Sequence, residues 1–147
     1  MIRRFFSIRL QPAELDFIIL VIRIVVGIAF VIAGWGKIQH PTTWMPKPMA
    51  FPAVFQLLAA VSEFCGGIAL ILGLLTRLGA FGIACTMTVA VYMHRFVFGD
   101  PFVNMTGGSS YQLAAVYGLI AILILIYGPG RYSVDRYLFG SASKIQA

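Results

Sequence analysis

The run FIILVIRIVVGIAFVIAG, residues 17–34, decides the fold of this protein. Its residues are apolar apart from Arg23. A run of this kind has the length, roughly 20 residues, that a helix needs to cross the hydrocarbon core of a bilayer. A charged side chain inside a membrane is costly unless it is paired, faces a bundle interior or has a function. The run therefore predicts a membrane-spanning helix that contains one residue of functional interest.

The composition of the whole chain extends this prediction. Of the 147 residues, 60% are hydrophobic and 11% are charged, and the mean hydropathy is +0.91. These values lie far from those of soluble globular domains. The sequence predicts one all-α domain over residues 1–147, an antiparallel four-helix bundle in the membrane. Its expected helices are residues 16–35, 52–75, 78–98 and 109–127, followed by a short interfacial helix over residues 133–139.

The positive charges predict the orientation of the bundle. Seven lysines and arginines fall on the side of the two termini and three on the other side. Because cytoplasmic segments carry the excess of such residues, we expect both termini in the cytoplasm. The net charge of +6 is then a topology signal and an attraction to anionic lipid, not a nucleic-acid surface. The seven are Arg3, Arg4, Arg9, Arg77, Arg131, Arg136 and Lys144, and the three are Lys37, Lys47 and Arg95.

A second buried charge is Glu63, in the run FQLLAAVSEFCGGIALILG of residues 55–73. With a rise of about 1.5 Å per residue, Glu63 lies about 21 Å above the cytoplasmic edge, whereas Arg23 lies at about 10 Å. We therefore expect carbonyls, hydroxyls or headgroups of the cytoplasmic half to hold Arg23, rather than Glu63. Glu63 itself should either contact Lys37 or His94 or be protonated and neutral, since an unpaired carboxylate there would be costly.

Polar residues of all four helices are predicted to meet in the outer half of the bundle. Small residues accompany them at helical spacing, which marks the faces that contact other helices. The expected contact faces are Arg23, Gly27, Phe30, Gly34 and Lys37 on the first helix, Glu63, Gly66, Gly67, Leu70 and Gly73 on the second, Ala80, Ala84, Met87, Val91 and His94 on the third, and Gln112, Ala115 and Leu119 on the fourth. The candidate ligand-binding residues are Lys37, Glu63, His94 and Gln112, with the aromatic residues Trp35, Tyr92 and Tyr111 around them. Three interpretations stay open: an ion pair that fixes helix register, a ligand or redox site, and a proton or ion path.

The sequence contains little that would bind a metal. Cys65 and Cys85 form no CxxC motif, so neither a redox pair nor a zinc site is indicated, and we expect them to be buried packing thiols. The two histidines, His40 and His94, lie in a loop and near a helix end, which does not suit haem ligands on facing helices. No metal or haem is predicted.

At these residues the chain resembles the DoxX family of small four-helix membrane proteins. The resemblance covers nearly the whole chain. The matching pieces are Arg23, Phe30, Gly34 and Lys37, then Glu63-x-x-Gly66-Gly67, Gly73-x-x-Thr76-Arg77, and GPGRYSVD at residues 128–135. One departure concerns the start of the fourth helix, where many members have an acidic residue and this chain has Tyr111 and Gln112. Because an amide does not titrate, proton-coupled chemistry is less favoured at that position.

The resemblance implies a bacterial inner-membrane protein of redox metabolism. Relatives include subunits of an archaeal thiosulfate:quinone oxidoreductase and proteins associated with radical and thiol detoxification, so a quinone or similar amphipathic molecule is the expected ligand. A partner subunit of a membrane oxidoreductase would then supply or accept electrons. The alternative is a non-catalytic accessory or assembly subunit of a larger membrane complex. Whether the chain is itself catalytic stays open, as does its oligomeric state.

Overall fold

The computed structural model describes residues 12–46 and 51–139, and these residues form helices and loops without strands. The all-α class is therefore confirmed. Arg3, Arg4, Arg9, Lys47 and Lys144, on which the predicted orientation partly depends, lie outside the described residues. The helices are α2 (Ala13–Gln39), α3 (Ala53–Leu72), α4 (Thr76–Tyr92) with its π-helical continuation η1 (Met93–Val97), α5 (Gln112–Tyr127) and α6 (Val134–Phe139).

Three of these helices are long and apolar enough to cross a membrane: α2, α3 and the continuous helix Thr76–Val97. The helix α5 is equally apolar but has 16 residues. At a rise of about 1.5 Å per residue it is about 24 Å long, somewhat shorter than a hydrocarbon core of about 30 Å. The described residues thus contain three helices that can span a bilayer and one shorter apolar helix, as expected of a multi-pass membrane protein.

Several helix boundaries differ from the predicted ones by a few residues, and two of the differences have clear local causes. The first helix continues beyond residue 35 to Gln39, and it ends because His40 leaves the helical region (φ −131°, ψ 64°) before Pro41. The joint between α3 and α4 is Gly73–Leu75 rather than Thr76–Arg77, because Gly73 adopts the left-handed conformation (φ 68°) that ends a helix. Both shifts matter, since Lys37 now lies in the last helical turn and Thr76 begins a helix.

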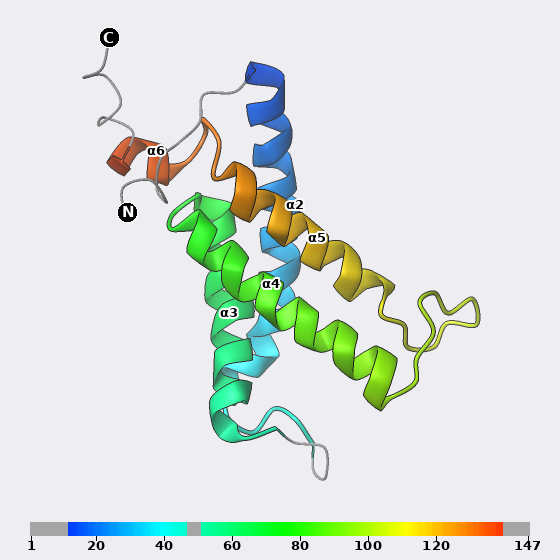
Figure 1. Cartoon of the computed structure of the whole chain (residues 1–147). Helices are drawn as coiled ribbons and strands as arrows, with labels where there is room; N and C mark the ends of the chain where they lie inside the picture. Colours follow the sequence, from blue (N-terminus) through cyan, green and yellow to red (C-terminus); the bar gives the residue numbers. More distant parts are fainter. Residues whose placement is uncertain (1–11, 47–50, 140–147) are drawn as a thin grey trace.

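Figure 1 shows the helices as two antiparallel pairs, α2 with α3 and α4 with α5. The pairs meet where α3 turns into α4, and from there α4 and α5 run away from α2 and α3 at an angle. We call the meeting point the Arg23 end and the far end of α2 and α3 the Lys37 end. The rings of Phe30 and Tyr117 link α2 to α5 with centroids 5.3 Å apart.

Glycines set the distance between α2 and α3. A Cβ added to Gly27 would lie 2.8 Å from the carbonyl oxygen of Gly67, and one added to Gly34 would lie 2.7 Å from the backbone nitrogen of Phe64. No larger residue fits without moving backbone, so the two helices touch at these points. The predicted contact faces of α2 and α3 are confirmed: Arg23, Gly27, Phe30 and Gly34 are buried, as are Glu63, Gly66, Gly67 and Leu70.

The predicted contact face of α5 is wrong. Gln112 is exposed and Leu119 is 68% exposed, whereas Ala121 and Ile124 are fully buried. Because α5 is apolar on every side, its sequence does not indicate which face meets protein.

The thiols of Cys65 and Cys85 were also expected to be buried, but both are exposed on the outer faces of their helices, where lipid surrounds a membrane protein. The core contains Val26, Phe30, Leu70, Ala80, Ile83, Ala84, Met87, Ala121 and Ile124.

Candidate functional site

The Lys37 end contains an ion pair between α2 and α3. The ammonium nitrogen of Lys37 lies 2.6 Å and 2.8 Å from the two carboxylate oxygens of Glu63. The Glu63 side chain is 3% exposed, while that of Lys37 is 28% exposed. The contact of Glu63 with Lys37 that we expected is therefore confirmed. It also gives the buried carboxylate the partner that a low-dielectric environment requires.

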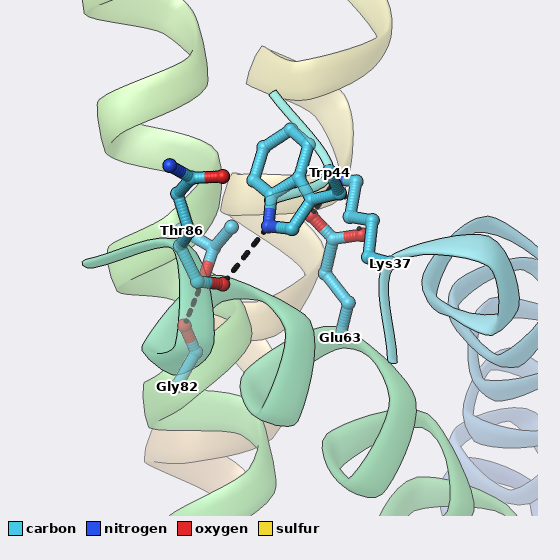
Figure 2. Close-up of polar contacts among 6 residues, drawn as sticks. Lys37, Trp44, Glu63, Gly82 and Thr86 are labelled. Atoms are coloured by element: carbon cyan, nitrogen blue, oxygen red, sulfur yellow. Dashed lines mark hydrogen bonds and ion pairs between the residues drawn. The ribbon is translucent and has the colours of Figure 1, made fainter. Parts of the chain in front are cut away.

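An aromatic side chain covers this pair. Trp44, in the loop after α2, places its ring centroid 4.6 Å from the Lys37 nitrogen, a cation–π contact (Figure 2). The indole nitrogen of Trp44 donates a hydrogen bond of 3.0 Å to the backbone oxygen of Gln56, which fixes the ring. The ammonium of Lys37 thus lies between a carboxylate and an aromatic face.

A buried amide holds the Trp44 loop in place. The side chain of Gln56 donates to the carbonyl of Phe51 (2.7 Å) and accepts from the backbone N–H of Met45 (3.1 Å). Gln56 is 3% exposed, so it is committed to these contacts. Sequence reasoning missed both Trp44 and Gln56. The available signal was an amide in the first turn of an apolar helix, directly after a tryptophan-containing loop.

The other predicted site residues lie elsewhere. In the π-helical turn η1, His94 Nδ1 lies 2.6 Å from a carboxylate oxygen of Asp100. Trp35 is 58% exposed and packs against Phe64, and Tyr92 is 59% exposed beside Phe96. Gln112 is exposed, and the ring of Tyr111 packs against that of Phe102. Of the seven predicted residues, the structure brings Lys37 and Glu63 into direct polar contact and adds Trp44 and Gln56 around them.

The hydroxyls of α4 do not form a relay toward this pair. Thr86 donates to the carbonyl of Gly82 (3.0 Å, Figure 2), and Thr88 donates to that of Ala84 (2.8 Å). Both bonds lie within the helix itself, which is the usual state of such hydroxyls in apolar helices.

A second polar cluster lies at the Arg23 end. The guanidinium of Arg23 is 1% exposed and donates to backbone carbonyls: through Nε to Leu70 (3.0 Å), and through Nη1 to Tyr132 (3.0 Å) and Pro129. These acceptors belong to α3 and to the segment after α5. The expectation that carbonyls near this end, and not Glu63, hold Arg23 is confirmed. An arginine in this geometry joins three parts of the chain.

Two buried carboxylates complete this cluster, and sequence reasoning missed both. Asp16, 1% exposed, accepts from the backbone N–H of Arg131 (3.0 Å) and pairs with its Nε (3.3 Å). Asp135 accepts from the N–H groups of Leu75 (2.7 Å) and Thr76 (2.9 Å). The available signal was the motif GPGRYSVD, residues 128–135. Its polar residues Arg131 and Asp135 make their contacts with residues far away in the sequence.

The two clusters differ in what they can do. The contacts of Arg23, Asp16 and Asp135 lie within the chain and tie the segment after α5 to the other helices, which is a structural role. The Lys37–Glu63 pair combines a buried carboxylate with a partly exposed lysine side chain and an aromatic cover. Ligand sites are typically apolar with a few convergent polar groups, so the Lys37 end is the candidate functional site.

Comparison with known proteins agrees with this architecture. The DoxX family model matches residues 18–96, which include Arg23, Lys37 and Glu63. The chain is 34% identical over 123 residues to the inner membrane protein YqjF of Escherichia coli K12, covering 82% of this chain and 91% of that protein. It is 32% identical over 143 residues to an uncharacterized membrane protein of Mycobacterium tuberculosis, covering 88% and 86%. No solved structure matches.

The helices and their internal charges define a small multi-pass membrane protein whose helices pack through glycines. The chain belongs to the DoxX family. Its location is the inner membrane, in which its apolar helices contact lipid.

Proposed function

We propose that this DoxX-family protein takes part in redox metabolism by binding the head of a quinone, or of a similar amphipathic molecule, at Lys37 and Glu63. The observation that carries the proposal is the partly exposed side chain of Lys37, whose ammonium is held against the buried carboxylate of Glu63. An ammonium donates hydrogen bonds, and a quinone carbonyl accepts them. The carboxylate keeps the donor in place when the cover over it moves.

The cover is the part of the site that must change. Two contacts of the Lys37 nitrogen go to Glu63, and its third direction faces the Trp44 ring. A carbonyl oxygen would take the place of the ring there, and the flat head of the ligand would stack on the displaced indole. The apolar tail would lie along lipid-facing side chains nearby, such as Ile32 and Trp35.

In this proposal both chain termini are cytoplasmic and all four apolar helices, including α5, cross the bilayer as a four-helix bundle. The seven-to-three distribution of lysines and arginines supports that orientation. The Lys37 end then lies in the outer half of the membrane. Electrons would pass between the quinone and a partner subunit of a membrane oxidoreductase, or a substrate that reacts with the quinone directly.

A second candidate function follows if the Lys37–Glu63 ion pair binds no ligand. With two contacts to Glu63 and one to the Trp44 ring, the Lys37 ammonium already has partners within the chain. Such a pair can simply fix the register of α2 against α3, as polar groups do in membrane bundles. The protein would then be a non-catalytic accessory subunit of a larger membrane complex.

Organic extraction of the purified protein separates the two. A quinone at a fixed ratio to the wild-type protein, lost in the Lys37→Met/Glu63→Gln double variant while that variant stays folded, supports the ligand site. Removing both charges avoids leaving one of them buried without its partner. The matched control is Gln112→Ala, at an exposed polar residue of another helix. A double variant that retains full quinone content and activity contradicts the proposal, and a fixed partner subunit without bound quinone favours the accessory function.

A further inference from the structure

The geometry around Lys37 points to a second ligand class, which does not depend on quinone binding. We propose that Glu63 and Trp44 form a binding site for the primary ammonium group of an amphipathic amine, and that Lys37 occupies this site from within the chain. A carboxylate on one side and an aromatic face on the other are the two elements that hold organic ammonium ions in proteins. Here both contact the same nitrogen atom, at 2.6 Å and 2.8 Å from the carboxylate oxygens and 4.6 Å from the ring centroid.

The two walls of this ammonium site are fixed independently of Lys37. Glu63 lies on a stretch of α3 that touches α2 through Gly34 and Gly67, where no added side chain fits. The Trp44 ring is fixed by its hydrogen bond to Gln56, whose own amide is buried and holds the loop. In this proposal the two walls keep their geometry when Lys37 leaves, unlike the quinone proposal, in which the Trp44 ring is displaced.

Lys37 is the flexible member of the site. It lies in the last turn of α2, its side chain is 28% exposed, and its ammonium is attached through four rotatable methylene groups. A buried carboxylate without a cation is costly, so Lys37 leaves only when another cation takes its place. Exchange of one ammonium for another conserves the charge and the contacts, which makes it the low-cost way to open this site.

The distances define the chemistry of the ligand. Both short contacts to Glu63 require N–H donors, which a primary ammonium has and a quaternary ammonium does not. The site lies within one turn of the end of α2, so the head of an amphiphile can reach it while its tail stays in lipid. The ring of Trp35, which is 58% exposed, packs against that of Phe64, the residue after Glu63, and offers an apolar surface for that tail. The expected ligand is a long-chain primary amine.

This proposal and the quinone proposal make opposite predictions for one variant. Lys37→Met removes the donor that a quinone would need, so it should abolish quinone binding. The same change removes the internal competitor for the ammonium site, so it should strengthen amine binding. Measuring quinone binding and amine binding by the Lys37→Met variant therefore tells the two proposals apart.

The experiment uses the full-length protein in lipid nanodiscs with dodecylamine as the probe. Trp44 reports binding by fluorescence in a Trp35→Phe background, since the chain has two tryptophans. Lys37→Met should bind dodecylamine about ten-fold more tightly than the protein with Lys37, because the competing internal cation is gone. Dodecyltrimethylammonium, with the same tail, should bind more weakly than dodecylamine to the same variant. Nanodiscs without protein correct for partition into the bilayer.

Two further variants keep the test decisive. Lys37→Met/Glu63→Gln and Lys37→Met/Trp44→Ala, followed by thermal shift, should lose the stabilisation by dodecylamine. If Lys37→Met does not fold, its rescue by dodecylamine during purification supports the site, and Lys37→Gln, whose amide can still donate to Glu63, serves for the affinity measurement. Equal affinity with and without Lys37, or equal binding when Glu63 is replaced, would overturn the proposal.

Discussion

The carboxylate of Asp135 accepts a hydrogen bond of 2.7 Å from the backbone N–H of Leu75, 60 residues earlier in the chain. Leu75 is the one non-glycine among the described residues with a positive φ, 49°. A leucine in this conformation is strained, so the surrounding structure must hold it there. The same carboxylate accepts from Thr76 N–H and so caps the start of α4, which has no side-chain cap of its own.

Asp135→Ala should destabilise the protein by about 2–4 kcal/mol, because it leaves the buried N–H of Thr76 and the partly buried N–H of Leu75 without an acceptor. Thermal or denaturant unfolding in detergent measures the change. The matched control is Tyr137→Ala in the same short helix, where the side chain is 85% exposed and should matter little to the unfolding of the helices. Equal unfolding of the Asp135→Ala variant and the wild type would show that the turn holds its conformation without the carboxylate.

Arg23→Lys should be almost as damaging as Arg23→Leu. The guanidinium reaches carbonyls of Leu70, Pro129 and Tyr132 through two different nitrogens, and a single ammonium cannot cover that spread. We expect a loss of about 2 kcal/mol or more in unfolding free energy for either variant, since buried acceptors lose their donors. Val25→Ala, at a 60% exposed side chain of the same helix, is the control. A fully stable Arg23→Lys protein would mean that the positive charge is sufficient for stability and that the several N–H donors of the guanidinium are not needed.

Gly34→Ala and Gly36→Ala form a matched pair two residues apart. A Cβ at Gly34 would lie 2.7 Å from the backbone nitrogen of Phe64, whereas one at Gly36 would meet nothing within 4 Å. The first change should separate α2 from α3 next to the Lys37–Glu63 pair and cost about 1–3 kcal/mol. The second should be neutral in the same unfolding assay. Equal stability of the two variants would contradict the close approach of α2 and α3.

Gln56→Leu should release Trp44 without touching the ion pair directly. It removes the two side-chain hydrogen bonds to Phe51 and Met45 that hold the loop. In a Trp35→Phe background, Trp44 emission should move to longer wavelength and acrylamide quenching should increase, since the ring becomes more exposed to water. Gln112→Leu, at an exposed glutamine outside the loop, is the control. Unchanged quenching would show that the Gln56 amide does not position Trp44.

The proposed orientation can be tested with single cysteines in a background lacking Cys65 and Cys85. Cysteines at Gln11 and Lys144 should be protected from impermeant thiol reagents in intact cells, and one at Thr43, in the loop beside Trp44, should react. The reason is the excess of lysine and arginine on the side of the two termini. Reaction at either terminus would contradict cytoplasmic ends.

The sequence by itself determined that the chain is a multi-pass membrane protein, because transfer of a helix into lipid depends on the hydropathy of each segment and not on its partners. The sequence also predicted that Arg23 and Glu63 lie at different depths and do not pair, since the constant rise along a helix fixes the depth of every residue on it. The glycine faces of α2 and α3 could be predicted for a related reason: small residues are where helices can approach closely.

Only the tertiary structure decided which polar groups meet. The pairing of Asp16 with Arg131 spans 115 residues, and the approach of Trp44 to Lys37 depends on the path of one loop. No periodicity in a single segment contains that information. The helix α5 is the clearest case, since lipid is as apolar as its leucines and isoleucines and any of its faces could have turned inward. In the structure Ala121 and Ile124 of α5 lie in the core, whereas Gln112 is exposed.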